Sequence, residues 1–215
     1  FCQMILQCGK HRLVLDRPLI MGVVNVTPDS FSDGGHYLSL DAAVAHARRQ
    51  IDEGADLLDI GGESTRPGAA AVSLEEERRR VLPVLEALLP ANIPLSIDTQ
   101  KPELMREAAA AGAAMINDVN GFEAVGALQS VSGSDCAVCI MHKQGQPQTM
   151  QQAPQYRDVV AEVDAYLHAR MVAAEAAGIA PSRLVIDPGF GFGKTLEHNM
   201  SLLRELDRLV AAGVP

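Results

Sequence analysis

The chain has 215 residues, of which 47% are hydrophobic and 4% aromatic, with no Trp. That length suits one domain or a slightly short α/β barrel, and the apolar content is ample for a core. The formal net charge of -9, with no block of Lys or Arg, argues against nucleic acid or an anionic membrane as the main partner. Because the sequence has no long apolar stretch and no signal-peptide pattern, we expect a cytoplasmic protein.

The elements expected in chain order begin with a short hairpin within residues 1–15, which turns at Gly9 and Lys10. We expect this hairpin to lie under a barrel. Six apolar runs follow, and each ends on a polar residue or close to one. These residues are Asn25, Asp59, Asp98, Asn117, His142 and Asp187. Strands that end on carboxylates or amides gather distant residues into one polar site, as at the C-terminal mouth of a (β/α) barrel.

Helical spacing of apolar residues, together with start and stop signals, predicts six helices after these runs. They are expected at 39–54, from a Ser73 capping box to near Pro90, from a Thr99 cap to Gly112, at 123–131, at 156–178 and at 198–213. Alternation of strand and helix predicts a parallel sheet with right-handed crossovers. Polar loops follow the strands at 26–38, 61–72, 118–122, 143–155 and 188–197, on the face of a barrel that carries catalysis.

The fold class predicted from this order is α/β, a (β/α)8 TIM barrel with about six βα units in a single domain over 1–215. The sequence stops at AAGVP, where a seventh strand would start. We expect a C-terminal truncation with strands seven and eight missing, because the inner face of a barrel needs closure. An open six-stranded sheet is the alternative.

Two loops after strands carry polar groups suited to a charged ligand. In NVTPDSFSDGG, Asn25 offers an amide oxygen, which is a hard ligand suited to Mg²⁺; a turn with a capping Asn is the alternative. In DIGGESTRPG, two glycines allow close backbone approach, and Ser64, Thr65 and Arg66 offer hydroxyls and a planar cation. This second loop favours an anion site over a solvated loop.

Asp98, Asn117 and Asp187 are expected to point together into the mouth of the sheet. Buried carboxylates repel unless a donor-rich ligand pairs with them. A flat heterocycle with an amino group next to a ring N–H presents such donors, so the set favours a pterin-like or guanine-like ring. The alternative for each residue is a helix cap.

Three other patterns are compared with nucleotide-binding, redox and metal-binding motifs. DPGFGFGKT fails the phosphate-loop pattern because Pro188 replaces a glycine, and it fails the dinucleotide pattern at Lys194. Its Phe190 and Phe192 are suited to covering a flat ring. The CxxC at Cys136 lies in a strand-like run, where residues three apart face opposite sides, so we expect no redox or zinc pair. His142 lacks a metal-binding cluster, which favours a structural role over a general base.

At these motifs the chain resembles the dihydropteroate synthase family. The segments NVTPDSFSDGG, DIGGESTRPG, SIDTQKP, INDVNG, MHKQGQPQTMQ and DPGFGFGKT follow that family's pattern in the same order, from about residue 19 to the end. The resemblance implies a folate-synthesis enzyme that uses Mg²⁺ and joins p-aminobenzoate to 6-hydroxymethyl-7,8-dihydropterin pyrophosphate, giving dihydropteroate and pyrophosphate. Loss of the C–O bond would leave a pterin-methyl cation, which the aryl amine attacks.

The resemblance also implies roles for individual residues, with catalysis expected from the ring contacts and Arg66. Asp98, Asn117 and Asp187 resemble the pterin-ring contacts, with Asp59 nearby and Met141, Gly191 and Phe192 as pocket wall. Asn25 resembles the residue at the metal and pyrophosphate, and Thr65 and Arg66 resemble pyrophosphate contacts. Phe31, Pro67 and Phe192 resemble the p-aminobenzoate pocket, where sulfonamides compete.

One departure concerns the end of the chain. The family has a Ser-Arg-Lys segment after strand seven and an Arg-x-His after strand eight, and both are missing here. We expect the chain ending at Pro215 to be inactive alone, and the full-length protein to be a homodimer. One rival, a methyltetrahydrofolate-binding methyltransferase domain, is disfavoured because it needs no pyrophosphate loop. A second, a non-catalytic homologue, is disfavoured because Phe31, Thr65 and Arg66 are present.

Overall fold

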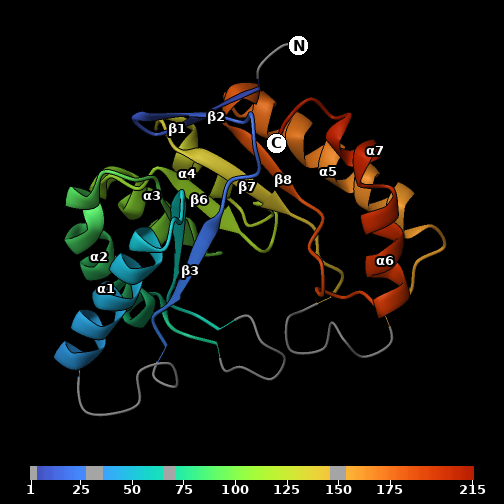
Figure 1. Ribbon diagram of the computed structural model, residues 1–215. Coiled ribbons are helices and arrows are strands. Elements are labelled where there is room, and N and C mark those ends of the chain that lie inside the picture. Colours follow the sequence, from blue (N-terminus) through green and yellow to red (C-terminus); the bar gives the residue numbers. More distant parts are fainter. Residues whose placement is uncertain (1–3, 28–35, 65–70, 146–153) are drawn as a thin grey trace.

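A six-stranded parallel sheet forms the centre of the part of the chain that the structure describes. The computed structural model describes residues 4–27, 36–64, 71–145 and 154–215, with the backbone alone at 36–39. The strands are β3 (Met21–Asn25), β4 (Leu57–Gly61), β5 (Leu95–Asp98), β6 (Met115–Asp118), β7 (Ala137–Met141) and β8 (Leu184–Asp187). They lie in chain order and every neighbouring pair is parallel (Figure 1). The α/β fold and the six expected strands are confirmed.

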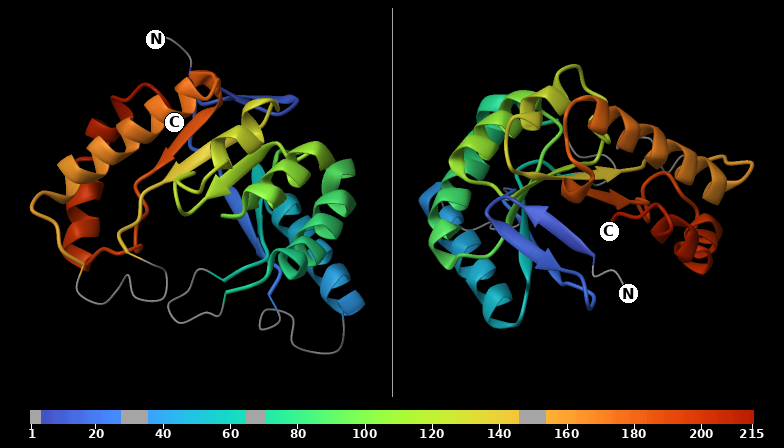
Figure 2. Two further views of the ribbon diagram at one scale, coloured as in Figure 1. Left: turned by 180° about the vertical axis from the view of Figure 1, so that it is seen from behind. Right: turned by 90° about the horizontal axis from the view of Figure 1, so that it is seen from above.

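Helices cover the convex side of this curved sheet (Figure 2). They are α1 (His36–Asp52), α2 (Leu74–Leu88), α3 (Pro102–Ala111), α4 (Ala127–Ser132), α5 (Val159–Ala176), α6 (Leu196–Arg204) and α7 (Leu206–Val210), with short 3₁₀ turns at Leu89–Ala91 and Pro181–Arg183. Within the described ranges, none of these helices is both long and apolar enough to cross a bilayer. Because neighbouring strands are parallel, their C-terminal ends lie along one edge of the sheet.

Three of the helix predictions need correction. The helix expected over 198–213 is two helices, because Thr195 and His198 form a capping box that starts α6 early and Glu205 leaves helical geometry at φ −110°. The helix expected from residue 123 starts at Ala127, after Gly126 in a left-handed conformation. Thr99 does not cap α3 but accepts a hydrogen bond from the backbone N–H of Lys101, which is itself the N-cap.

Successive side chains of a strand point to opposite faces of the sheet, and an apolar core lies on each face. The outer core packs strand residues such as Leu58, Ile97 and Ile140 against the helices. The inner core joins Met115 and Cys139 to the hairpin of β1 (Ile5–Cys8) and β2 (His11–Val14), which pair antiparallel. The hairpin therefore covers the inner face of the sheet near the N-terminal ends of the strands. The C-terminal ends of the strands are left for polar residues.

The two cysteines of the CxxC lie in different cores. Cys136 packs in the outer core, where its Sγ donates to the carbonyl of Ala113 at 2.9 Å. Cys139 packs in the inner core, and both are free thiols. This placement confirms that the two residues face opposite sides of the sheet. Beyond α7, the backbone N–H of Ile186 donates to the carbonyl of Pro215 at 2.8 Å, which places the last residue beside β8.

Candidate active site

The strand register brings the predicted polar residues together at one edge of the sheet. Asn25 is level with Gly61, Gly61 with Asp98, and Asp98 with Asn117. Alternate residues of a strand share a face, so Asp59 lies on the same inner face as Gly61. Met141 and Asp187 are paired in the same way on β7 and β8. The structure therefore gathers residues from six strands that are far apart in sequence.

A partly buried hydrogen bond links Asn117 to Asp59. The Asn117 side chain donates from Nδ2 to Asp59 Oδ2 at 2.9 Å. The amide oxygen of Asn117 is buried and has no partner among the described residues. The second carboxylate oxygen of Asp59 is also buried and makes no hydrogen bond of good geometry there, although burial raises the pKa of this carboxyl and the neighbouring Ser96 hydroxyl lowers it in part. A buried acceptor without a donor costs on the order of 1–3 kcal/mol. These two oxygens are therefore suited to a ligand that supplies N–H groups.

The carboxylates around this pair repel negative charge strongly. Burial, followed by the charges of Asp59 and Asp118, raises the pKa of Asp98 well above its ordinary value. Burial also raises the pKa of Asp187, although the backbone N–H of Gly189 donates to its Oδ1 at 2.7 Å. Burial likewise raises the pKa of Asp59. A cationic or donor-rich ring would relieve this repulsion.

Asn25 lies at the exposed end of β3, across Gly61 from Asp98. A Cβ built on Gly61 would lie 3.7 Å from Asn25 Oδ1 and 3.5 Å from Asp98 Oδ2, so the glycine keeps the space between the two oxygens open. Across the described ranges, no cluster of three His, Cys, Asp or Glu side chains could hold a metal. This donor set fits Mg²⁺ only with a substrate that adds phosphate oxygens, because Mg²⁺ is usually held by one or two protein groups plus phosphates and water.

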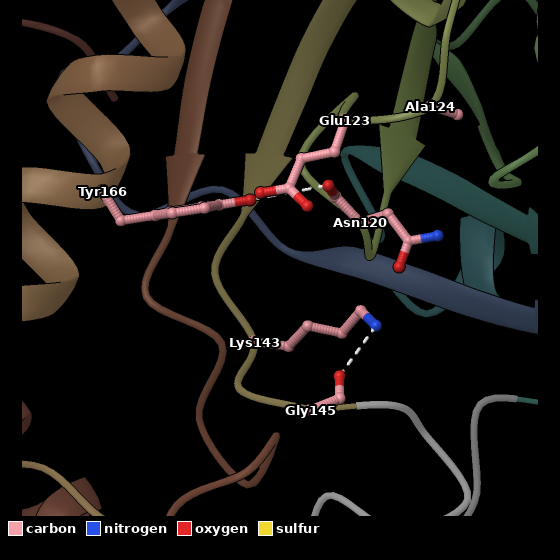
Figure 3. Close-up of a pocket in the computed structure, with 6 residues that line it drawn as sticks. All are labelled: Asn120, Glu123, Ala124, Lys143, Gly145 and Tyr166. Carbon is pink, nitrogen blue, oxygen red and sulfur yellow. Dashed lines mark hydrogen bonds between the residues drawn. The ribbon is translucent and has the colours of Figure 1, made fainter.

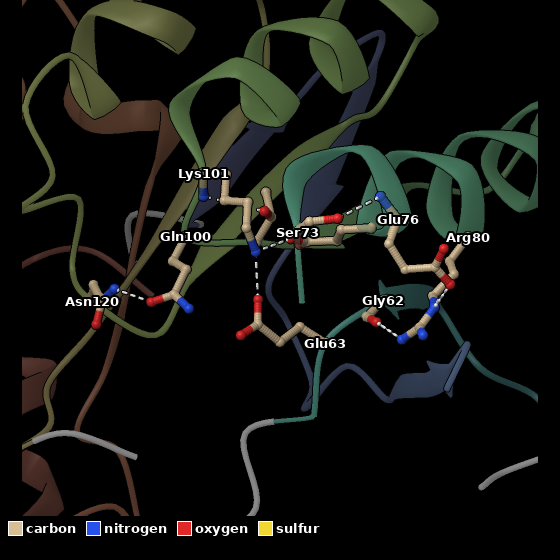
Figure 4. A network of polar contacts seen from close by, with 10 residues as sticks. Gly62, Glu63, Ser73, Glu76, Arg80, Gln100, Lys101 and Asn120 are labelled. Carbon is tan, nitrogen blue, oxygen red and sulfur yellow. Dashed lines mark hydrogen bonds and ion pairs between the residues drawn. The ribbon is translucent and has the colours of Figure 1, made fainter. Parts of the chain in front are cut away.

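The base of the loop after β4 is tied down by a network that the sequence did not reveal (Figure 4). Lys101 bonds Glu63 at 2.5 Å and also pairs with the buried Glu77 of α2. Burial lowers the pKa of Lys101, but its hydrogen bonds to Glu63 and Glu77 outweigh burial and raise the pKa overall. Arg80 donates to the carbonyl of Gly62 at 2.8 Å. The only sequence signal was the position of Lys101 just before a helix.

Four predicted site residues lie outside the described residues: Phe31, Thr65, Arg66 and Pro67. In the loop after β8, Gly191 is exposed and Phe192 is partly buried, whereas Phe190 is 41% exposed. Met141 is buried at the end of β7. Met141 thus lies at a strand end and Phe192 in the loop that follows one, and their role as pocket walls stays a prediction.

His142 has the properties of a structural residue. Burial, with the charge of Lys194 second, lowers its pKa to about 4. Its ring packs edge-on against Tyr166, with centroids 5.0 Å apart, and lies tilted against Tyr156, with centroids 6.1 Å apart. The imidazole is therefore neutral at neutral pH and enclosed by aromatic groups.

A polar cavity of about 430 Å³ lies beside these strand ends, between the loops after β6 and β7 and helix α5 (Figure 3). It is lined by Asn120, Glu123, Ala124, Lys143, Gly145 and Tyr166. Lys143 donates to the carbonyl of Gly145 at 3.0 Å, and the Asn120 amide bonds Gln100 at 2.5 Å. The predicted ring contacts are not among the lining residues, so this cavity is a neighbour of the candidate site.

Comparisons with known proteins agree with this geometry. The family model described as "Pterin binding enzyme" matches residues 21–215. The chain is 53% identical over 195 residues to dihydropteroate synthase of Escherichia coli K12, covering 90% of this chain and 69% of that protein.

Two solved structures have closely similar folds. Xanthomonas albilineans dihydropteroate synthase with 4-aminobenzoic acid is 56% identical with a TM-score of 0.92, over 99% of this chain and 76% of that one. Burkholderia cenocepacia dihydropteroate synthase complexed with 7,8-dihydropteroate is 50% identical with a TM-score of 0.87, over 97% and 72%. The barrel-family assignment is thereby confirmed, and the chain belongs to the dihydropteroate synthase family of pterin-binding enzymes.

Proposed function

We propose that this protein condenses p-aminobenzoate with 6-hydroxymethyl-7,8-dihydropterin pyrophosphate, giving 7,8-dihydropteroate and pyrophosphate. The observation that carries the proposal is the pair of buried acceptors on Asp59 and Asn117, which make no hydrogen bond of good geometry among the described residues and are enclosed by further carboxylates. A pterin ring presents an amino group and ring N–H groups, which are the donors this edge lacks. Family membership, and relatives named for this reaction, support the same substrate class.

The ring is held by groups from four strands. Asn117 and Asp187 accept from the amino and ring N–H donors, and Asp98 accepts from the opposite edge of the ring. Asp59 fixes the orientation of the Asn117 amide through the 2.9 Å hydrogen bond. Met141, Gly191 and Phe192 form the wall, which limits access of water to the reacting carbon.

The reaction is a substitution at the carbon attached to the pterin ring. The C–O bond breaks, and pyrophosphate leaves with the electron pair. Buried carboxylates around the ring favour the positive charge that then develops on it. The amine nitrogen of p-aminobenzoate forms the C–N bond and loses one proton to solvent.

The leaving group is assigned to the loops after β3 and β4. Thr65 and Arg66 are proposed to bind the pyrophosphate, and Phe31 and Pro67, with Phe192, to enclose the p-aminobenzoate ring. Asn25 would hold Mg²⁺, which supplies positive charge beside the phosphates when bound. The base of the second loop is fixed by Lys101 and Arg80, so these groups would start from an anchored backbone.

The test is dihydropteroate formation by the protein expressed from its complete gene, with both substrates and with each omitted. Asp98→Asn keeps the shape but replaces an acceptor oxygen with a donor, so kcat/KM should fall at least about 100-fold. Asp41→Asn, on the exposed surface of α1, should stay within about twofold. Failure of the unaltered protein to form dihydropteroate would refute the proposal. Equal activity of the two variants would remove Asp98 from the site.

The same assay separates the rival functions. A methyltetrahydrofolate-binding domain would bind a reduced folate and release no pyrophosphate. A non-catalytic homologue would bind the pterin substrate without turnover. Pyrophosphate release that depends on p-aminobenzoate is expected only of the proposed synthase.

Three further properties stay proposals. A Mg²⁺ requirement is tested by chelation, which should stop turnover but leave binding of a pterin without phosphates unchanged. A homodimer is tested by sedimentation of the protein from its complete gene. A cytoplasmic location is supported by the free thiols of Cys8, Cys136 and Cys139, which are typical of a reducing compartment.

A further inference from the structure

Lys194, at the end of the GFGFGK segment, is a buried lysine with no catalytic assignment. The residue lies in the loop between β8 and α6 and is only 3% exposed. The ammonium nitrogen lies 3.0 Å from His142 Nδ1, 2.9 Å from the carbonyl oxygen of Gly189, 3.1 Å from that of Phe192 and 3.2 Å from that of His142. An ammonium has three N–H donors, so these four acceptors satisfy all of them.

This enclosure shows why the lysine does not act like that of a phosphate-binding loop. A lysine that binds phosphate must present its donors to the ligand, whereas Lys194 directs them into the protein. Burial lowers the pKa of Lys194 to about 8, so it still carries its charge at neutral pH. The neutral ring of His142 can accept at Nδ1, because its pKa lies at about 4. The ammonium therefore binds protein atoms only.

The acceptors come from two loops that are separate in sequence. Gly189 and Phe192 belong to the loop after β8, and His142 follows β7. The two loops are in close contact, because a Cβ on Gly189 would overlap the carbonyl oxygen of His142. Tyr156 adds a third tie by donating from its hydroxyl to the carbonyl of Gly193 at 3.0 Å. Lys194 is thus the charged centre of a junction between the ends of β7 and β8.

This junction includes two residues of the proposed ring site, Asp187 and Phe192. The Gly189 backbone, whose carbonyl Lys194 holds, donates its N–H to Asp187 Oδ1 at 2.7 Å. The Phe192 carbonyl, also held by Lys194, belongs to the residue expected to form the wall. The backbone N–H of His142 donates to the carbonyl of Asp187 at 3.0 Å. A shift of the ammonium would therefore move both Asp187 and Phe192.

We propose that Lys194 is a positioning residue of the ring site, and that its buried ammonium clamps residues 188–193 so that Asp187 and Phe192 face the pterin ring. The inference rests on the proposed function for its kinetic consequence alone. The clamp itself is a property of the folded chain and can be tested without substrate.

The first experiment is hydrogen exchange on the complete protein, comparing Lys194→Met with Lys143→Met. Methionine has nearly the same length as lysine but no donors. Lys143 lies on the neighbouring loop and bonds only the carbonyl of Gly145 among the contacts described. Lys194→Met should speed amide exchange at residues 189–193 at least tenfold, with β5 and β6 unchanged. Lys143→Met should change neither region. An unchanged loop, or equal acceleration in β5 and β6, would overturn the clamp.

The second experiment is kinetic and includes a chemical rescue. Lys194→Ala should lower kcat/KM for the pterin substrate by about 100-fold, because small displacements of positioned groups have effects of that size. Added n-propylammonium, which replaces the lost atoms and charge, should restore at least tenfold of that loss. The neutral 1-propanol should restore none. Rescue by both compounds, by neither, or a loss below twofold would overturn the positioning role. If the unaltered protein forms no dihydropteroate, the proposed function fails, while the exchange result still decides the clamp.

Discussion

Asn117 has more hydrogen-bonding capacity than the protein uses. Its amide gives one N–H to Asp59, and its oxygen stays unpartnered in the part of the chain that the structure describes. Folding thus aligns the amide with one internal bond and leaves its acceptor for a ligand. Buried polar groups without partners usually have a functional reason, and here that reason is a ring that donates.

Asn117→Ala should weaken binding of a dihydropterin at least tenfold, because it removes an acceptor and releases Asp59. It should also reduce the free energy of unfolding by about 1–3 kcal/mol, since the Asp59 carboxyl then loses its donor. Titration calorimetry and urea unfolding measure the two effects. Gln129→Ala, on the exposed face of α4, is the control and should change neither. Unaltered affinity in Asn117→Ala would contradict the assigned contact.

His142 should make stability depend on pH in a predictable direction. Its pKa is 6.5 in the unfolded chain and about 4 in the folded protein, because of burial and the charge of Lys194. Between these values the unfolded state binds more protons, so stability contributed by neutral His142 is complete above pH 6.5 and is lost as pH falls toward 4. The loss should be on the order of 3 kcal/mol.

Urea unfolding of the protein and of His142→Gln at several pH values tests this. The difference in free energy of unfolding between the two should shrink as pH falls from 6.5 to 4. Burial raises the pKa of Asp118 to about 6, which gives the opposite slope in part of this range. That contribution is common to both proteins and cancels in the difference. If the difference in free energy of unfolding between the two proteins stays constant with pH, His142 is not the source of the pH dependence.

At the scale of the elements, the loop after β8 depends on glycines with different constraints. Gly189 has φ +67° and no room for a Cβ, which would overlap the His142 carbonyl. Gly191 has φ +82°, but no heavy atom lies within 4 Å of a Cβ placed there. Both positions disfavour an L side chain, and only the first also meets a steric obstacle.

Comparing Gly189→Ala with Gly191→Ala therefore separates the energetic cost of backbone strain from that of steric overlap. Gly191→Ala should cost about 1–2 kcal/mol of unfolding free energy, the usual penalty of the left-handed region. Gly189→Ala should cost clearly more, because the loop must also move away from β7. Thermal and urea unfolding measure both values. Equal costs would mean that the junction between the loops adjusts freely.

Local sequence signals predicted most of the elements, and tertiary contacts explain the failures. Apolar runs that end in polar residues identified all six strands, since burial on both faces requires continuous apolar sequence. The split between α6 and α7 was missed because residues 204–206 contain neither Gly nor Pro. The start of α6 was misplaced because His198, rather than Glu or Gln, completes the capping box.

The candidate site was predictable only where the chemistry lies at a strand end. Asp98, Asn117 and Asp187 could be placed together because parallel strands end at one edge. The contacts of Lys194 with His142 and of Lys101 with Glu63 join residues 52 and 38 positions apart. No periodicity encodes such pairs, so they required the structure. The positions of Phe31, Thr65, Arg66 and Pro67 stay predictions.

In the molecule as a whole, the residues that stabilise the fold and the residues of the candidate site lie in different parts of the sheet. The outer core and the hairpin-covered inner core hold the strands, and the polar residues occupy the remaining edge. Leu6 of the hairpin is 4% exposed in the inner core, whereas Val14 is 38% exposed. The hairpin should therefore contribute to stability through one face only.

Leu6→Ala should reduce the free energy of unfolding by about 2–4 kcal/mol, as expected for a buried leucine that leaves a cavity. Val14→Ala should change it by less than about 1 kcal/mol. Urea unfolding of the two variants measures the contrast. A similar small effect of both would mean that the hairpin does not hold the inner core together.

The central claim is that buried oxygens at the strand ends bind a ring through its N–H donors. The most direct measurement compares the affinity of the complete protein for a 2-amino pterin with that for the matching 2-oxo ring, by titration calorimetry. The exchange replaces the amino donor with a carbonyl acceptor, adds a hydrogen at ring N1, and changes the shape little. We expect binding at least about 100-fold weaker for the 2-oxo ring, because the buried acceptors would face the new carbonyl acceptor. Equal affinity for the two rings would contradict it.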